Sequence, residues 1–456
     1  MTLLNFSEDE DMSGMKRNLV LALAVAAVVA APSAFATYGY FSHGYGMTAK
    51  GMGGASTAMA KDTFGGANNP ASMVWVGNRL DVGVDVFSPH RKAERTGSTT
   101  ATFNVSGESA SNEFFVPEFG YNSMLSPDAS FGVTVYGNGG MNTNYPGGLM
   151  TGAAEAGICG STVSGFNPGS TGQNILCGNN NVGVDLAQLI IAPTFSYKIN
   201  PSNSVGISPL IGFQRFKAEG LQGFAGFSRE SNYLTNNGYD TSTGGGVRVG
   251  WMGKVNNMVR LGAAYSSRMY MSPFDKYRGL FAESGDFDIP ANWNVGTAIK
   301  LGQNTTVAID FQKIDYGSVR SVGNSSRNYG TTTTNSLGPD DGRGFGWSNV
   351  KVWKVGLEHQ ASGNLTLRAG YGLTTNPVNS RDVTFNILAP GVVRQHLTLG
   401  GTYNMSRSSE ITAALMHAAN NDVSGPSLYQ DFGVAAGNEK IEMYQNSLGA
   451  AWSQKW

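Results

Sequence analysis

The side chains that could support catalysis are few and scattered along the chain. None of the five histidines belongs to an H-E-x-x-H zinc motif, and the sequence holds no G-x-S-x-G nucleophile motif, Walker A loop or dinucleotide-binding fingerprint. A serine–histidine pair built from distant strands, with His359 or His417 near a strand end, is the one enzyme arrangement that stays open. The sequence therefore predicts a protein that is not an enzyme, with no catalytic residues and no cofactor.

The composition separates this chain from soluble proteins and from helical membrane proteins. Only 14% of the residues are charged, 62 are glycine, and the mean hydropathy is slightly negative. A soluble surface normally carries about 25% charged residues, whereas a sheet with one face in lipid and one in water averages to a mild hydropathy. The net charge of -1 gives no basic footprint for a nucleic acid.

The N-terminus has the three parts of a secretory signal. Lys16 and Arg17 precede an apolar run of 13 residues, and Ala34-Phe35-Ala36 provides the small residues that signal peptidase requires. A helix needs roughly 20 apolar residues to cross a bilayer, so a membrane anchor is the weaker alternative. We expect residues 1–36 to be the signal peptide, with residues 1–14 as a spurious upstream extension.

Alternation of apolar and polar residues recurs along the rest of the chain. Leu365, Leu367 and Tyr371, for example, alternate with small or polar residues, as in a strand with one side against lipid. We predict fourteen such strands, at residues 78–89, 112–122, 129–138, 185–198, 203–216, 243–255, 258–270, 287–301, 304–316, 350–360, 364–375, 393–404, 410–420 and 443–456.

The links between these strands alternate between short and long. The short links carry turn residues such as Ser-Pro-Asp and Asn-Pro-Ser-Asn, and the long links span roughly 16 to 46 residues. A soluble sandwich has no reason to sort its links in this way, but an up-and-down outer-membrane barrel does. The sequence therefore predicts an all-β fold, a 14-stranded antiparallel transmembrane β-barrel over residues 78–456, in the outer membrane of a Gram-negative cell.

The last predicted strand is amphipathic and ends on an aromatic residue. Leu448, Ala450 and Trp452 alternate with smaller residues, and the sequence stops at Trp456. This ending resembles the signal by which outer-membrane barrels are recognised during insertion. We therefore expect the barrel assembly machinery to be a partner during biogenesis.

The two cysteines, Cys159 and Cys177, both fall in the long link after the third strand. The periplasm and the cell surface are oxidising, so we expect a disulfide that closes this link. No histidine or further cysteine lies nearby in the sequence, and a metal site is not predicted.

Residues 37–77 precede the first strand and are rich in small residues, with almost no charge. A segment of this length without charge is poorly suited to be a solvated tail. A barrel of about fourteen strands has a lumen wide enough to accept it. We therefore expect residues 37–77 to form a plug, or hatch, inside the barrel.

The spacing of residues in this segment is similar to that of a known family. The pattern consists of Gly44-x-Gly46, Ala49-x-Gly51-x-Gly53-x-Ala55, Asp62 and Asn69-Pro70-Ala71. It resembles the hatch of the FadL family of outer-membrane long-chain fatty acid transporters, which includes the TodX-type channels for aromatic hydrocarbons. The resemblance implies a monomer that passively transports hydrophobic small molecules. Long-chain fatty acids are the first substrate that it implies, and aromatic or aliphatic hydrocarbons are the alternative.

The resemblance also implies a route. Substrate is caught near the surface loops, binds in the lumen against the hatch, and leaves sideways at a kink in the third strand. Glycines weaken strand pairing, so the run Gly137-Asn138-Gly139-Gly140 is the expected kink, unless these glycines only begin the next loop. The candidate ligand-binding residues are the hatch aromatics Tyr38, Tyr40 and Phe41 and the loop aromatics Phe216, Phe224 and Phe227.

Several alternatives stay open at this point. The loop aromatics could contact lipopolysaccharide or outer-membrane lipid rather than a substrate. A general porin would need a constriction lined by charge clusters, and an adhesin would act through its long loops. Arg260 and Arg368 are predicted to face the lumen. We expect them to pair with Asp81, Asp85 or Asp310, because an unpaired buried charge is costly.

Overall fold

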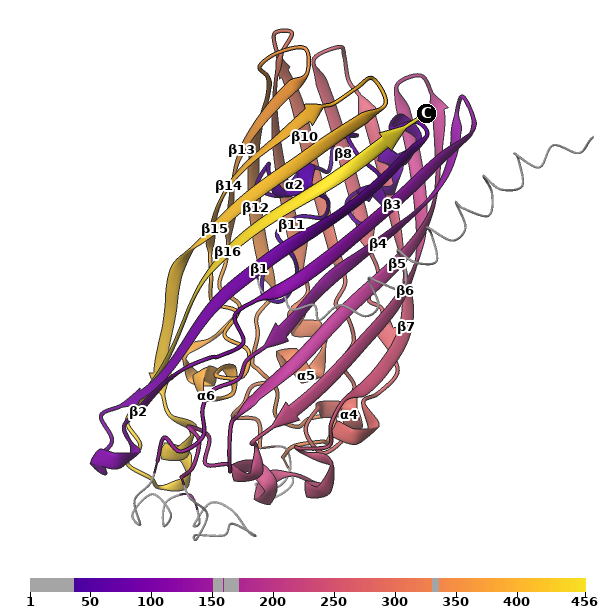
Figure 1. Cartoon of the computed structure of the whole chain (residues 1–456). Helices are drawn as coiled ribbons and strands as arrows, with labels where there is room; N and C mark the ends of the chain where they lie inside the picture. Colours follow the sequence, from indigo (N-terminus) through magenta and orange to yellow (C-terminus); the bar gives the residue numbers. More distant parts are fainter. Residues whose placement is uncertain (1–36, 151–158, 160–171, 330–335) are drawn as a thin grey trace, which may run out of the picture.

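The computed structural model describes residues 37–150, 159, 172–329 and 336–456, so the predicted signal peptide and its upstream extension lie outside the described residues. Fourteen long antiparallel strands of the described chain close into a barrel, because β16 (Asn438–Lys455) pairs with β1 (Arg79–Thr96) (Figure 1). Arg79 lies opposite Lys455 and Thr96 opposite Asn438, so this closure runs along both strands. The predicted fold class is confirmed.

The predicted strands and the observed strands correspond one to one. The wall continues from β1 through β3 (Phe114–Ser126), β4 (Ala129–Asn142), β5 (Gly183–Asn200), β6 (Asn203–Glu219), β7 (Asp240–Lys254), β8 (Val259–Ser266), β10 (Asn292–Leu301), β11 (Thr305–Ile314), β12 (Val350–Gln360), β13 (Leu365–Thr374), β14 (Gln395–Asn404) and β15 (Ser409–Pro426) to β16. Two short strands are added at its margins, β2 (Val105–Glu108) on β1 and β9 (Tyr270–Met271) on β7.

The alternation of side chains explains why these strands form a membrane wall. On β14, Leu397 and Leu399 are 60% and 56% exposed on the outer face, whereas Thr398 and Thr402 are buried inside. Successive side chains of a strand point to opposite faces, so one sequence period provides both a lipid face and a polar lumen. None of the helices in the described part of the chain is both long and apolar enough to cross a membrane.

The largest extensions beyond the predicted bounds, of five to seven residues at one end, occur in three strands. β1 continues to Thr96, β15 to Pro426, and β16 begins at Asn438. The pairing of β15 with β16 passes a register shift between Ala418 and Asn421 and continues into a polar stretch. The outward side chains of that stretch are polar, namely Asp422, Ser424, Lys440 and Glu442. It projects beyond the rest of the wall (Figure 1), and so the lipid-facing pattern does not reveal it.

The long links carry short helical turns and gather at the end of the barrel opposite the C-terminus (Figure 1). Short turns face the periplasm and long loops face outward in barrels of this type. The helices in the links are η3 (Ala101–Phe103), η4 (Gln222–Phe227), η5 (Ser231–Tyr233), η6 (Asp275–Tyr277), α4 (Ala282–Gly285), η7 (Tyr316–Ser318), α5 (Arg320–Gly323), η9 (Ser380–Asp382), α6 (Val383–Asn386) and η10 (Leu428–Phe432).

Residues 37–77, called the inner segment below, lie within the ring of strands (Figure 1). The inner segment contains α2 (Met47–Lys50), η1 (Phe64–Gly66) and η2 (Pro70–Trp75), and most of its side chains are buried. α2 contacts β14, β15 and β16, whereas η2 contacts β4 to β7. The inner segment therefore bridges two separate arcs of the wall.

Candidate functional site

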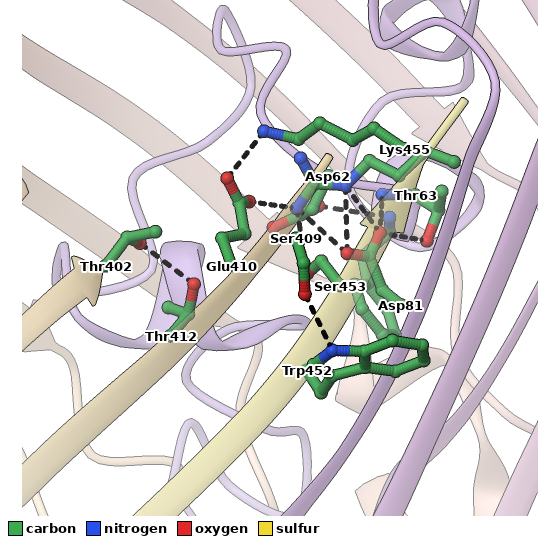
Figure 2. Close-up of polar contacts among 12 residues, drawn as sticks. Asp62, Thr63, Asp81, Thr402, Ser409, Glu410, Thr412, Trp452, Ser453 and Lys455 are labelled. Atoms are coloured by element: carbon green, nitrogen blue, oxygen red, sulfur yellow. Dashed lines mark hydrogen bonds and ion pairs between the residues drawn. The ribbon is translucent and has the colours of Figure 1, made fainter. Parts of the chain in front are cut away.

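Inward-facing carboxylates of the wall bind the backbone of the inner segment. One oxygen of Asp310 on β11 accepts hydrogen bonds from the N–H groups of Ser56 and Thr57, both at 2.8 Å. Asp81 on β1 accepts from the N–H and the hydroxyl of Thr63 at 2.9 and 2.6 Å (Figure 2). Buried N–H groups need partners, and these donors are outside any strand ladder, so wall carboxylates supply the acceptors.

Ion pairs reinforce the same attachment. Lys50 Nζ lies 3.0 Å from Asp85 Oδ2 and 3.3 Å from Glu118 Oε2, and all three side chains are buried. At the short-turn end, Glu410 of β15 forms ion pairs with two other wall residues, Lys455 at 2.5 Å (Figure 2) and Arg79 at 2.6 Å. The lumen charges close to the inner segment are therefore largely paired.

Arg368 faces the lumen, but the expectation that it pairs with Asp81, Asp85 or Asp310 is wrong. Arg368 Nε lies 2.9 Å from Glu358, the residue directly opposite it in the β12–β13 register. Asp85 and Asp310 are occupied by the inner segment, as described above. Arg260 lines an open cleft at the short-turn end together with Lys254 and Lys300, which are like charges. The register of β12 against β13 thus determines the partner of Arg368, which could not be identified from the sequence alone.

Asn69-Pro70-Ala71 forms one of the closest contacts between the inner segment and the wall. Asn69 Nδ2 donates to the carbonyl oxygens of Thr57 at 2.8 Å and of Trp251 on β7 at 3.0 Å. Its Oδ1 accepts from the N–H of Ala71 at 3.1 Å and so caps η2, where Pro70 occupies the first position. One side chain therefore closes the helical turn and ties it to the barrel.

Glycines of the wall make this close packing possible. A Cβ at Gly262 on β8 would overlap the carbonyl oxygen of Thr57, and one at Gly370 on β13 would overlap the backbone at Met52 and Gly53. Glycine on a strand often marks a site where another backbone approaches. Other wall glycines in the same relation to the inner segment are Gly206, Gly250, Gly356 and Gly449.

The predicted hatch aromatics lie together at the start of the inner segment. The hydroxyl of Tyr316 donates to the carbonyl oxygen of Tyr38 at 2.6 Å and accepts from the N–H groups of Tyr40 and Phe41, both at 3.1 Å. Tyr38, Tyr40 and Phe41 are all buried, and the Tyr40 ring lies 5.8 Å from the ring of Trp347. The tight turn at 38–41 thus directs the rings of Tyr40 and Phe41 to the link between β11 and β12, whereas the ring of Tyr38 lies against His396 of β14, 4.9 Å away.

The predicted third-strand glycines lie where the wall loses a pairing. β3 pairs with β4 only as far as Val135, which lies opposite Phe119. Beyond it β4 remains paired with β5, with a register shift between Gly137 and Gly139. Inner-segment backbone occupies the vacated edge, since the Ser42 N–H donates to the Asn138 carbonyl and the Gly140 N–H to the Tyr40 carbonyl, both at 3.1 Å. A small cavity of about 20 Å³ adjoins this stretch, lined by Phe87, Met141, Trp347 and Met443 among others.

A second apolar cavity lies among the loops. It measures about 30 Å³ and is lined by Phe216, Phe224, Leu221, Leu280, Phe281 and Phe385 among others. Two of the predicted loop aromatics, Phe216 and Phe224, are therefore in its wall. Apolar cavities near 150 Å³ accommodate benzene, so a ligand of that size must displace lining side chains here.

A row of aromatic rings joins the two cavities. Phe216 lies 4.7 Å from Phe281, Phe281 lies 4.9 Å from Phe287, and Phe287 lies 6.0 Å from Tyr40, measured between ring centroids. The last step leads from Tyr40 to Trp347, which lines the cavity beside the unpaired part of β4. The loop aromatics and the hatch aromatics thus belong to one apolar core.

Phe227 and the cysteines support the loops rather than line a cavity. The ring of Phe227 stacks on Phe432 of η10 at 4.7 Å, and it lies 6.5 Å from Phe224. Cys159 and Cys177 form a disulfide with a Cα–Cα distance of 5.4 Å. The contact between Phe227 and Phe432 joins two links that are distant in the sequence, whereas the disulfide closes the single link between β4 and β5.

This core is apolar, and the imidazole next to it is uncharged. Burial lowers the pKa of His43 in the inner segment to about 3, with the charges of Lys50 and Lys354 as further causes, so this imidazole is neutral near pH 7. The described residues contain no cluster of three or more histidine, cysteine, aspartate or glutamate side chains that could hold a metal ion. The imidazole of His43 thus adds no charge to the lumen near pH 7.

The sequence does not single out several residues of this row. Tyr316, Trp347, Phe281 and Phe287 stand in long links or at strand ends, where no periodicity marks them. Their proximity depends on how two separate links, one between β9 and β10 and one between β11 and β12, fold over the lumen. The only sequence signal for these residues is their aromatic character, in links that are otherwise rich in glycine and serine.

Comparisons with solved structures agree with this architecture. The toluene transporter TodX of Pseudomonas putida superposes with a TM-score of 0.63 at 18% identity, over 91% of this chain and 99% of that chain. The toluene transporter TbuX of Ralstonia pickettii gives 0.59 at 17% identity, and a FadL homologue of Pseudomonas aeruginosa gives 0.62 at 14% identity, each over 91% of this chain and 99% of that chain. At this level of identity the likeness concerns the fold.

Sequence comparison provides the family. Curated proteins gave no match. The sequence model of the family described as outer membrane protein transport protein (OMPP1/FadL/TodX), however, matches residues 161–432, which is more than half of the chain. The chain therefore belongs to the OMPP1/FadL/TodX family of outer-membrane transport proteins.

Proposed function

We propose that the protein is a passive channel for hydrophobic small molecules, with long-chain fatty acids as its first substrate. The observation that carries this proposal is the row of rings from Phe216 to Trp347, which connects the loop cavity to the cavity beside β4. Substrate would enter among the loops, move along these rings, and leave sideways past residues 137–140.

A sideways exit suits the energetics of such substrates. Burial of each methylene in apolar surroundings contributes about 0.8 kcal/mol. A route that ends in the bilayer keeps this contribution, whereas release into periplasmic water would lose it. The edge of β4 that β3 leaves and the inner segment covers, together with the register shift at Gly137 and Gly139, supports an opening at this place in the wall.

The inner segment would act as the hatch. Its attachment to the wall through Asp81, Asp310 and Asn69 supports a lumen closed to water-filled passage. A general porin has no use for such a segment, so this packing favours the hydrophobic channel. The similarity in fold to TodX and TbuX, which are described as toluene transporters, favours monoaromatic hydrocarbons as the second candidate substrate.

An uptake experiment distinguishes these possibilities. Cells that lack their own fatty acid channel would be given labelled long-chain fatty acid, toluene or a small sugar, with and without this protein. We expect fatty acid uptake to depend on the protein and sugar uptake not to. Dependence of toluene alone would establish the hydrocarbon alternative, dependence of the sugar would establish a porin, and no dependence for any of the three would overturn the proposal.

A further inference from the structure

Arg343 is a buried cation next to the loop cavity. It follows α5 in the link between β11 and β12, and its side chain is only 1% exposed. Its Nε donates to Ser336 Oγ at 2.6 Å and its Nη1 to the Ser326 carbonyl oxygen at 3.0 Å. The guanidinium also lies over the ring of Phe227, 5.1 Å from the centroid. These contacts hold the group in one orientation.

The charge of this guanidinium is not matched by a carboxylate. Its Nη2 is buried and makes none of the hydrogen bonds found among the described residues, although the guanidinium lies over the ring of Tyr329, 4.6 Å from the centroid, and the Tyr329 hydroxyl interacts with its charge. The carboxylate whose charge acts on Arg343 is Asp431, but Asp431 is already engaged by Arg327 and by the hydroxyl of Tyr329. Burial lowers the pKa of Arg343 to about 10, which still leaves it protonated near neutral pH. A buried charge of this kind is costly unless something pairs with it.

Arg343 is also among the residues that line the apolar loop cavity. Arg343 shares that cavity with Phe216, Phe224, Leu280 and Phe385, and the other side chains around it are predominantly apolar. The cavity is therefore almost entirely apolar, and one cationic residue in its wall has a buried donor, Nη2, that a ligand could reach only by displacing the side chains around it. An arginine in such a place recognises carboxylates well, because hydrogen bonds between ionised partners are short and strong.

We propose that Arg343 is a specificity-determining residue that selects hydrophobic carboxylates over neutral hydrocarbons at the loop cavity. The apolar part of the ligand lies among Phe216, Phe224 and Phe385, and its carboxylate accepts a hydrogen bond from Arg343 Nη2. This inference rests on the proposed function and names the substrate class of that same site. A neutral hydrocarbon would occupy the cavity and leave the cation unpaired.

The test compares ligands that differ only in their head group. Decanoate, decanol and decylamine would be titrated against the purified full chain near neutral pH. We expect wild-type protein to bind decanoate more tightly than decanol by roughly tenfold to a hundredfold, as for one hydrogen bond between charged groups, and to bind decylamine most weakly. Equal binding of the three ligands would overturn the inference without any variant being needed.

Two substitutions locate the preference at this residue. Arg343→Met removes the charge but keeps an unbranched apolar side chain, and Arg343→Lys keeps the charge without the planar fork. We expect Arg343→Met to lose the preference for decanoate while its decanol binding stays unchanged, and Arg343→Lys to retain part of the preference. Arg320→Met, in the same link but half exposed and beside Glu283, is the matched control and should behave as wild type.

The outcomes separate this inference from the proposed function. Equal weakening of decanoate and decanol in Arg343→Met would mean that Arg343 only supports the loops, and would overturn the inference. If Arg343→Met fails to fold, as judged by loss of the heat-modifiable barrel band on a gel, the head-group order in wild-type protein decides the question. Hydrophobic uptake that persists in cells without a preference for carboxylates would leave the channel proposal intact and refute the role of Arg343.

Discussion

The carbonyl oxygen of Tyr40 accepts a hydrogen bond from the N–H of Gly140, 3.1 Å away, at the edge of β4 that β3 has left. An inner-segment residue thus takes the position of a missing neighbouring strand. The inner segment and the place of the proposed exit are therefore hydrogen-bonded to each other, and we expect a change in either to alter the other.

Substitution of Gly139 tests this link directly. A Cβ at Gly139 would overlap the Tyr40 carbonyl oxygen, so Gly139→Ala should push residues 40–42 away from β4. Loss of the two backbone hydrogen bonds leaves buried groups unpaired, at about 1–3 kcal/mol each. We expect amide hydrogen exchange in the first peptide of the inner segment to accelerate by roughly tenfold or more. Gly401→Ala on β14, whose Cβ would meet only ordinary contacts, is the control, and unchanged exchange in Gly139→Ala would contradict the link.

Substitution of Asn69 tests whether the inner segment seals the lumen. Asn69→Ala removes the donor to the Thr57 and Trp251 carbonyl oxygens and the cap of η2. The lost cap alone costs about 1 kcal/mol, and the two unpaired carbonyl groups add to this. We expect proteoliposomes with Asn69→Ala to admit a small sugar faster than those with wild-type protein. Asn257→Ala, in an exposed short turn, should not change the rate, and an equally slow Asn69→Ala would show that the seal does not depend on this motif.

The sequence predicts most of the wall because the physics of the wall is local. Period-two alternation follows from lipid on one side and the lumen on the other, so every predicted strand has its counterpart in the structure. Where that constraint ends, beyond the lipid on β1, β15 and β16, the predicted bounds are too short. The hatch pattern, with Asn69-Pro70-Ala71, could be recognised because its residues are spaced within one continuous segment.

The candidate site is less predictable because it depends on contacts between distant links. Arg368 pairs with Glu358 through strand register, which no motif announces. Tyr316 and Trp347 reach the inner segment only once their link has folded over the lumen. Phe216 and Phe224 can be predicted from the sequence as aromatic residues near a strand end. The position of Arg343 beside them cannot be predicted in this way. The roles of all these residues stay predictions until they are tested.

A pair of phenylalanines on one strand provides a matched test of the loop cavity. Phe216 is 1% exposed and lines the cavity, whereas Phe213 on the same strand is 41% exposed toward lipid. Phe216→Ala removes a large part of the apolar contact, while Phe213→Ala leaves the cavity untouched. We expect uptake of labelled fatty acid to fall several-fold in Phe216→Ala at equal amounts of folded barrel. Equal uptake by the two variants would show that substrate does not pass this cavity.

The carboxyl group of Asp62 should make the seating of the inner segment depend on pH. Burial, and then the charge of Asp81 beside it, raises the pKa of Asp62 from 3.8 to about 7, although Arg79 opposes this (Figure 2). The seated state therefore binds a proton more tightly than the unseated state. Protonation of Asp62 therefore stabilises the seated state. This stabilisation is fully present below about pH 4 and is lost as the pH rises through 7.

Single-channel recording in planar bilayers measures this dependence, because unseating should appear as brief ionic openings. In wild-type protein we expect the opening frequency to rise between about pH 4 and about pH 7, by up to about tenfold per pH unit, and then to level off. Asp62→Asn cannot ionise, so its openings should be rare and independent of pH, whereas Asp128→Asn in an exposed turn should follow wild type. The same rise in Asp62→Asn as in wild type would assign the pH dependence to another group, and a fall in frequency with rising pH would reverse the sign argued here.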